Sequence, residues 1–309
     1  MKLYLLLLSG VFLVLVKASA QTDVAFSHYW MMEPQFNPAA VGVTPHLRIL
    51  GCYSNQMSGY TDNPKTMFLG ADMPLHLRHA VGGYFLNDAI GAFTHKNVVV
   101  EYAYRFPLGQ GTMSLGAQGE IRSETIDGGK MDVEDTSDPA IPKGTLNGTR
   151  LDLGVGAYYS HPLFYAGISS LHLTAPEVTL GETNQIDVKR TYYFTAGGNI
   201  NVKNTLYSLH PSMRWMYDGV TDRLDISLRA QLKNGKQRLF AGVTYSPSIS
   251  STLFVGGMFR GVMLSYSYEA YTGGAGLGNG AHELTMSYEI DINLAKKGKN
   301  RHQSVRLLL

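Results

Sequence analysis

Apolar and polar residues alternate with a period of two along much of the chain, most clearly toward its C-terminal end. The apolar positions there are Leu284, Met286, Tyr288, Ile290, Ile292 and Leu294, and polar residues fill the positions between them. Alternation at this period predicts a β-strand with one apolar and one polar face. A strand of about eleven residues that sets Glu289 and Asp291 opposite an aliphatic face is typical of a membrane barrel, whose outside meets lipid and whose inside meets water.

The same alternation marks about 14 segments between residues 46 and 294. They lie at 46–56, 65–73, 79–87, 95–106, 111–122, 150–160, 163–170, 191–200, 206–217, 223–232, 237–246, 251–259, 262–270 and 282–294. An even number of antiparallel strands returns both ends of the barrel to the same side of the membrane. We therefore predict an all-β fold, a transmembrane antiparallel β-barrel of about 14 strands.

The predicted connections alternate between short and long, which is independent support for a barrel. The longest, Ser123 to Thr149 and Leu171 to Arg190, follow odd-numbered strands, whereas the short ones follow even-numbered strands. Asn234-Gly235 is a strong hairpin signal among the short ones, because both central residues of a type I′ turn need positive φ. Outer-membrane barrels have short periplasmic turns and longer external loops, so we expect both termini in the periplasm.

The two ends of the chain differ from the predicted barrel. Residues 1–20 read as a signal peptide, because Lys2 precedes an apolar run from Leu3 to Val16 and small residues follow, with cleavage before Gln21. The apolar run is too short to span a bilayer comfortably, since a span needs roughly 20 residues. Residues 295–309 form a short basic tail that cannot continue a lipid-facing strand; its cationic residues are Lys296, Lys297, Lys299, Arg301 and Arg306.

Composition supports an exported barrel over other classes. The hydrophobic content of 44% and mean hydropathy of −0.07 suit neither a helical membrane protein nor a disordered chain. The single cysteine, Cys52, cannot form an internal disulfide, so an exported chain of this size needs a conventional core or a closed barrel. The net charge of +2 gives no reason to expect nucleic acid as a partner.

Residues 21–45, which we call the N-terminal segment, precede the first predicted strand and are rich in large apolar side chains. These include Phe26, Tyr29, Trp30, Met31, Met32 and Phe36. A segment this apolar is unfavourable in free contact with water. We hypothesise that it folds into or beneath the barrel as a plug or a docking strap.

Several motifs resemble those of the PorP/SprF membrane proteins of the type IX secretion system of Bacteroidota. The mature chain opens with QTDVAFSHYWMMEPQFNPAAVG, and LDLGVGAYYSHPLFYAGISSLHLTAP follows from Leu151. A closing GAHELTMSY begins at Gly280. The family usually has serine where this chain has Ala281, and proline where it has Val24. The motif residues, whose role is unknown, are Phe26, Ser27, Tyr29, Asn37, Pro38, Gly42, Asp138, Pro139, His282 and Glu283.

The resemblance implies a non-enzymatic protein of the cell outer membrane that works with the secretion and gliding machinery. It implies partners among the periplasmic lipoprotein ring components, and a role in exporting or attaching secreted or surface cargo proteins. A general diffusion porin or solute transporter is the alternative function. Charged residues on the predicted inward faces suit either a water-filled pore or a lumen filled by ion pairs. They are Glu101, Arg105, Glu120, Asp152, Asp225, Arg229, Glu269, Glu289 and Asp291.

No residue pattern points to catalysis, a cofactor or a metal. His282-Glu283 lacks the spaced second histidine of a zinc site, so it is either a rim contact or simply orients the strand start. His76 and His79 flank a turn, and the glycine run from Gly273 to Gly280 lacks the lysine of a phosphate loop. Asp132, Glu134, Asp135 and Asp138 could bind calcium but more simply mark a solvated loop. A barrel enzyme would need a nucleophile motif that is not recognisable here.

Overall fold

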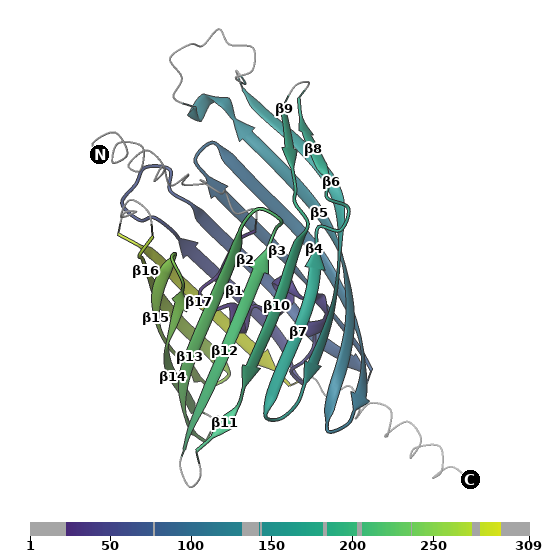
Figure 1. Ribbon diagram of the computed structural model, residues 1–309, viewed down its shortest axis with the longest axis vertical. Helices are drawn as coiled ribbons and strands as arrows, with labels where there is room; N and C mark the ends of the chain where they lie inside the picture. The colour runs from purple at the N-terminus through teal and green to yellow at the C-terminus, as the bar shows by residue number, and fades with distance from the viewer. Residues whose placement is uncertain are drawn as a thin grey trace, which may run out of the picture.

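The computed structural model is a β-barrel whose strands wrap around an internal segment (Figure 1). It describes residues 23–76, 78–131, 142, 144–181, 184–202, 206–235, 237–273 and 279–291. The predicted signal peptide, the basic tail from Ala295 and the motif pair Asp138-Pro139 lie outside the described residues.

Within these ranges, fourteen antiparallel strands close into one barrel, as the alternation predicts. Each of these strands pairs with the next one along the chain, including β10 with β12, and the pairing of β1 with β17 closes the ring. The strands are β1 (Leu47–Asn55), β2 (Lys65–His76), β3 (His79–Ile90), β4 (Phe93–Leu108), β5 (Gly111–Asp127), β6 (Thr145–Ser160), β7 (Phe164–Leu171), β10 (Thr191–Gly198), β12 (Tyr207–Tyr217), β13 (Asp222–Asn234), β14 (Gln237–Ser246), β15 (Ser250–Phe259), β16 (Val262–Tyr271) and β17 (Ala281–Ile290). The short β11 (Ile200–Asn201) pairs with one end of β12.

Apolar side chains cover the outside of the barrel, and polar side chains are buried inside it. On β15, Leu253 and Val255 are 65% and 56% exposed, whereas Thr252, next to Leu253, is 3% exposed. This inversion of a soluble core is typical of strands that meet lipid on one face. The described helices are all too short, or too polar, to cross a membrane.

The barrel wall is uneven in height, and its tallest strands extend beyond the predicted segments. β5 and β6 have 17 and 16 residues, and their pairing continues to Asp127 opposite Thr145. The sequence prediction stopped at 122 and began again at 150, because the outward positions of the extension are polar and the contrast between faces is lost there. β17 ends at Ile290, opposite the first residue of β1, Leu47, and residues 292–294 of the predicted last strand lie outside the described residues.

A small hairpin lies within a connection that the sequence analysis left without structure. β8 (Glu177–Leu180) and β9 (Asn184–Asp187) form a separate two-stranded sheet beside the upper part of β6 (Figure 1). Val178, Leu180 and Val188 are fully buried against Ile126 of β5. At the opposite end of the barrel the predicted hairpin is present, but Asn234 is still paired with Gln237 in the strands, so the turn begins at Gly235 (φ +59°), one residue later than the predicted Asn234-Gly235 turn.

Candidate functional site: the N-terminal segment inside the barrel

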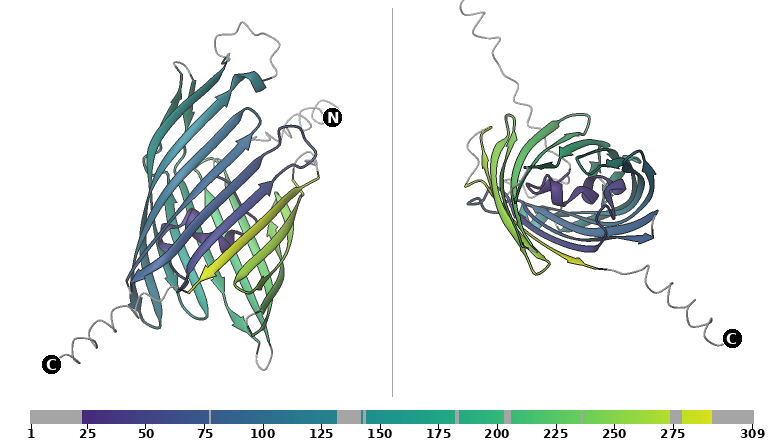
Figure 2. Two further views of the ribbon diagram at one scale, coloured as in Figure 1. Left: turned by 180° about the vertical axis from the view of Figure 1, so that it is seen from behind. Right: turned by 90° about the horizontal axis from the view of Figure 1, so that it is seen from below.

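The described part of the N-terminal segment, residues 23–45, lies in the lumen and fills much of its cross-section (Figure 2). It forms three short turns of helix: η1 (Tyr29–Met31), α2 (Glu33–Phe36) and η2 (Pro38–Ala40). Pro34 and Pro38 stand in the first turns of α2 and η2, where a missing N–H costs little. The Asn37 side chain accepts a hydrogen bond from the Ala39 backbone N–H and caps η2.

The segment runs from one mouth of the barrel toward the other. Asp23 lines a cavity of about 380 Å³ together with Gln56 and Pro64 of the β1–β2 connection and Ile186 of the hairpin. These residues belong to the end of the barrel that carries the longer connections. At its other end the segment leads into Leu47, where β1 begins at the short-turn end.

Glu283 of β17 is the main acceptor for the first part of the segment. Its carboxylate accepts hydrogen bonds from the backbone N–H groups of Ser27 at 2.9 Å and His28 at 3.0 Å. The Nδ1 atom of His28 lies 2.6 Å from the same carboxylate. The side chain of Glu283 is 2% exposed, so all three interactions form in a buried environment. Two predicted motif residues from opposite ends of the chain, Ser27 and Glu283, are thus in direct contact.

His282 has a different environment from Glu283, although the two are adjacent in sequence. Its Nδ1 atom lies 2.6 Å from the hydroxyl of Tyr266 on the outward side of the barrel. Successive side chains of a strand point to opposite faces, so the histidine and the glutamate cannot share one site. The structure therefore assigns the luminal contact to Glu283 alone.

Aromatic residues of the segment pack against the wall and one buried arginine. Phe26 meets Phe68 edge-on, with 5.9 Å between ring centroids. The guanidinium of Arg214 lies 4.8 Å from the centre of the Tyr29 ring, an arrangement that favours a cation–π interaction. Arg214 is also paired with Asp225 at 2.5 Å, so its buried charge is compensated.

Glycines on the inner wall make room for the turn at η2. A Cβ atom at Gly116 of β5 would lie 2.3 Å from the Ala39 backbone nitrogen, and one at Gly156 of β6 would lie 2.1 Å from the Asn37 side-chain oxygen. The Asn37 amide donates to the Ala157 carbonyl at 3.2 Å. The Asn37-Pro38 motif therefore packs directly against the glycine-rich motif that follows Leu151.

Near the end of the segment, Gly42 has a backbone conformation that residues other than glycine rarely adopt. Its φ is +64°, and a Cβ atom there would lie 2.5 Å from that of Ala80. Its N–H donates to the Asp72 carboxylate at 2.9 Å, and its carbonyl accepts a hydrogen bond from Arg105. These contacts turn the chain toward β1.

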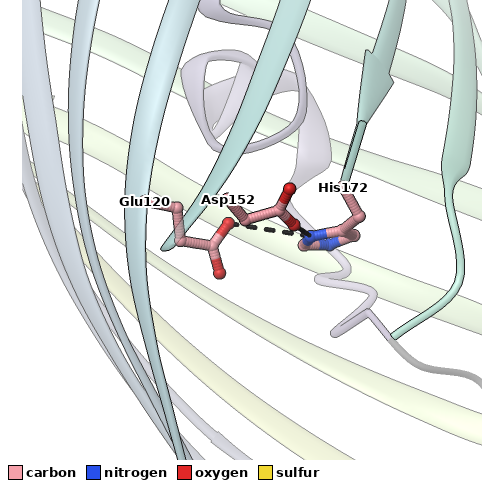
Figure 3. Close-up of side chains that lie close together, drawn as sticks. All are labelled: Glu120, Asp152 and His172. Atoms are coloured by element: carbon pink, nitrogen blue, oxygen red, sulfur yellow. Dashed lines mark hydrogen bonds and ion pairs between the residues drawn. The ribbon is translucent and has the colours of Figure 1, made fainter. Parts of the chain in front are cut away.

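A chain of ion pairs joins the start of the segment to the long strands β5 and β6, and Figure 3 shows its wall side, where His172 faces Asp152 and Glu120. His172, just after β7, places its Nε2 atom 2.9 Å from Asp23 and its Nδ1 atom 2.6 Å from Asp152 of β6. Burial alone would lower the pKa of His172, but the Asp23 carboxylate and the hydrogen bond to Asp152 raise it to about 10. Burial opposes ionisation of Asp23, yet His172 holds the pKa of this carboxyl well below its usual range. Both groups are therefore charged at neutral pH.

Glu120, Asp152 and His172 are the described residues best placed to hold a metal ion. One potential ligand atom from each lies within 4.8 Å of the others. Both ring nitrogens of His172 already face carboxylates, however, and Arg122 lies 3.7 Å from the Glu120 carboxylate. A protonated histidine cannot coordinate a metal, so this cluster is better explained as an ion-pair network between the N-terminal segment and the wall.

Glu33 gives the segment a dependence on pH. It accepts a hydrogen bond from the Tyr158 hydroxyl at 2.8 Å. Desolvation inside the lumen raises its pKa from 4.5 to about 7. Because the folded-state pKa is raised, the stabilisation by neutral Glu33 is fully present below pH 4.5 and is lost as the pH rises through about 7.

We expect the segment to be held more loosely at pH 8 than at pH 5, and we expect Glu33→Gln to remove much of this difference. The probe is Trp30, one of two tryptophans, in a Trp215→Phe background, with quenching by acrylamide as the measurement. The introduced glutamine stays neutral and still offers an oxygen to Tyr158. Glu177→Gln, an exposed position on β8, is the control and should keep the wild-type pH response. An unchanged response in Glu33→Gln would contradict the assignment.

The structure brings most of the predicted motif residues together and adds residues that the motifs did not mark. Phe26, Ser27, Tyr29, Asn37, Pro38, Gly42 and Glu283 all contact or form the luminal segment. Asp23, His28, Glu33 and His172 lie inside the quoted motifs but were not named among the motif residues, and Arg214 lies outside those motifs. Among the predicted inward charges, most are buried or half-buried inside the barrel, whereas Asp291 is exposed.

Comparisons with known proteins give a family and a fold. The family described as type IX secretion system membrane protein PorP/SprF matches residues 18–288. Among the curated proteins, none matches the chain at a significant level.

Several solved barrels share the fold at low sequence identity. A FadL homologue of Pseudomonas aeruginosa is 10% identical, with 82% of this chain and 92% of that chain covered and a TM-score of 0.51. The Ralstonia pickettii toluene transporter TbuX is 12% identical, with 84% and 92% covered and a TM-score of 0.52. The CymD monoaromatic hydrocarbon channel is 13% identical, with 88% and 95% covered and a TM-score of 0.51. Such likeness shows the fold alone.

Proposed function

Because the chain belongs to the PorP/SprF family of type IX secretion system membrane proteins, we propose that it serves this machinery by contact with other proteins. In this role it is a non-enzymatic outer-membrane barrel that contacts periplasmic ring components. It supports the export or surface attachment of cargo proteins. The family and the barrel fold both support the outer membrane as its location.

The observation that carries this proposal is the filled lumen. The N-terminal segment is held by Glu283 on one wall, by the His172 ion pairs on the opposite wall, and by the glycine-lined seat of η2. A general diffusion porin, one form of the alternative function, needs a continuous aqueous path. Buried side chains of the segment occupy the middle of that path, which favours a barrel that presents its rims to partner proteins.

We place the short-turn end of the barrel in the periplasm, because outer-membrane barrels generally have short periplasmic turns. With this placement β1 begins and β17 ends at the periplasmic rim. Asp23 then lies toward the outer mouth of the barrel. The described part of the N-terminal segment therefore starts on the exterior side, whereas from the sequence we expect the N-terminus in the periplasm. The basic tail after Leu294 would follow β17 on the periplasmic side, where cationic residues suit acidic partners.

The direct test is a pull-down from detergent-solubilised outer membranes with an affinity tag in the β1–β2 connection, followed by mass spectrometry. We expect secretion-system lipoproteins or a large surface protein to be recovered with the barrel. An unrelated outer-membrane barrel with the same tag is the control. Recovery of the barrel alone, together with ion conductance in planar bilayers, would favour the porin instead.

A further inference from the structure

The upper half of β6 has a free edge. β6 pairs with β5 over its whole length, from Thr145 to Ser160. Its other neighbour, β7, has only eight residues and pairs with β6 from Val155 to Ser160 alone. Among the described residues, no strand pairs with β6 on this side between Thr145 and Gly154. Figure 1 shows β6 rising beyond β7.

The backbone groups that face this edge can be identified. The Leu173 N–H donates to the Leu153 carbonyl at 2.9 Å, which shows that Leu153 directs its carbonyl away from β5. In an antiparallel strand every second residue has its N–H and C=O on the same side. Asn147, Thr149 and Leu151 therefore direct their N–H groups to the open edge. The Leu153 N–H, by contrast, is already 2.7 Å from the Asp152 carboxylate.

The open part of the edge lies at or above the lipid boundary. Outward side chains are apolar at Leu151 and Leu153, which are 73% and 54% exposed, but polar at Thr149 and Asn147. Unpaired backbone groups are unfavourable in hydrocarbon and tolerable in water. The β8–β9 hairpin covers the inner face of β6, where a Cβ atom at Gly148 would lie 2.7 Å from Val178, and it does not pair with the edge.

Two exposed arginines flank the edge. Arg150 donates to the Thr149 carbonyl at 3.0 Å and reaches the Thr179 hydroxyl at 3.4 Å. Arg190 donates to the Leu173 carbonyl at 2.7 Å, next to the last covered position. Each guanidinium has more donors than these contacts use. An extended chain that pairs with the edge would therefore meet positive charge at Arg150, within the open stretch, and at Arg190, next to its end.

We propose that the free edge of β6 binds an extended acidic segment of a partner polypeptide as an additional antiparallel or parallel strand. Main-chain hydrogen bonds to Asn147, Thr149 and Leu151 provide the pairing, and carboxylates of the partner contact Arg150 and Arg190. This inference rests on the proposed function and deepens it, because it names a surface by which the barrel holds another protein at the cell exterior. A free edge at this position is a ready template for strand addition.

The test uses the purified full-length barrel in detergent and a fluorescent peptide of about ten residues that alternates threonine or valine with aspartate. Thr149→Pro removes one edge N–H without removing a described hydrogen bond to β5, and proline is tolerated on edge strands. Thr149→Ala is the matched control, because both variants lose the weak contact of Thr149 with Ser123. We expect binding by fluorescence anisotropy to weaken about tenfold in Thr149→Pro and to change less than about twofold in Thr149→Ala.

Further outcomes decide the nature of the contact. A peptide N-methylated on alternate residues should lose binding, and a lysine-for-aspartate peptide should bind more weakly than the acidic one. Equal binding by Thr149→Pro and Thr149→Ala, or no binding of the acidic peptide up to millimolar concentration, would overturn the proposal. Unchanged tryptophan emission verifies that each variant is folded. Since co-purification of secretion-system components tests the proposed function separately, failure of the peptide assay alone leaves that function standing.

Discussion

Replacing Glu283 with alanine is expected to release the N-terminal segment from the lumen. The substitution leaves the N–H groups of Ser27 and His28 and the His28 ring without their buried acceptor. Breaking a buried charged hydrogen-bond pair by removing one partner typically costs about 3–5 kcal/mol. Because whole domains are stable by only about 5–15 kcal/mol, a loss of this size is large for the docking of one short segment.

Two measurements should show the release. Chymotrypsin should cleave Glu283→Ala within residues 26–36, which carry aromatic side chains, under conditions in which the wild type resists. Planar bilayers should show larger ion conductance, because the lumen is then open to water. His282→Ala is the matched control, since this neighbouring side chain faces outward toward Tyr266. Resistance to cleavage and wild-type conductance in Glu283→Ala would show that other contacts hold the segment unaided.

The barrel could be predicted from the sequence because its physical signal is local. One face of each strand meets lipid and the other meets water or buried polar groups, so every second residue reports the same environment. The signal fades where the environment changes, as on β5 and β6 above the membrane. There the outward residues Ser123, Thr125 and Asp127 are polar while Ile126 faces inward, so strand pairing continues to Asp127 opposite Thr145 without the apolar outer face that the pattern needs.

The luminal site could be predicted only in part, because its contacts join residues that are far apart in the chain. Ser27 and Glu283 are separated by 256 positions, and no local pattern relates them. The motifs indicated that both regions matter but not that they touch. His172 adopts a φ of +54°, unusual for a residue other than glycine, and only tertiary structure shows that this conformation directs its ring between Asp23 and Asp152.

The β8–β9 hairpin illustrates a further limit. Its strands have four residues each, shorter than a period-two pattern needs to stand out. What stabilises them is burial of Val178 and Leu180 against Ile126 and the absence of a side chain at Gly148, neither of which is visible in the segment alone. Both the hairpin and the free edge of β6 follow from a difference in strand length. β6 has 16 residues, whereas its neighbour β7 has only eight.

Gly116→Val is expected to displace the η2 turn from its packing position against the inner wall of the barrel. Valine favours strands, so on strand propensity alone the substitution should stabilise β5. Its Cβ, however, would lie 2.3 Å from the Ala39 backbone nitrogen and 2.4 Å from the Pro38 carbonyl carbon. These are backbone atoms of a turn that cannot rotate away, so the turn itself must move. Overpacking of this kind costs about 1–3 kcal/mol or more.

The expected result of Gly116→Val is a barrel that still forms but whose N-terminal segment becomes accessible to chymotrypsin and whose Trp30 emission shifts to the red. Gly119→Val provides the control on the same strand, because this glycine faces outward and its nearest neighbouring atom would be 3.9 Å from the new Cβ. If Gly116→Val and Gly119→Val expose the N-terminal segment equally, then the strand itself needs glycine at position 116, and the contact with the segment is not the reason. A difference confined to Gly116 would mean that the close approach of Ala39 to the wall is what keeps the lumen filled, since the two substitutions change strand propensity equally.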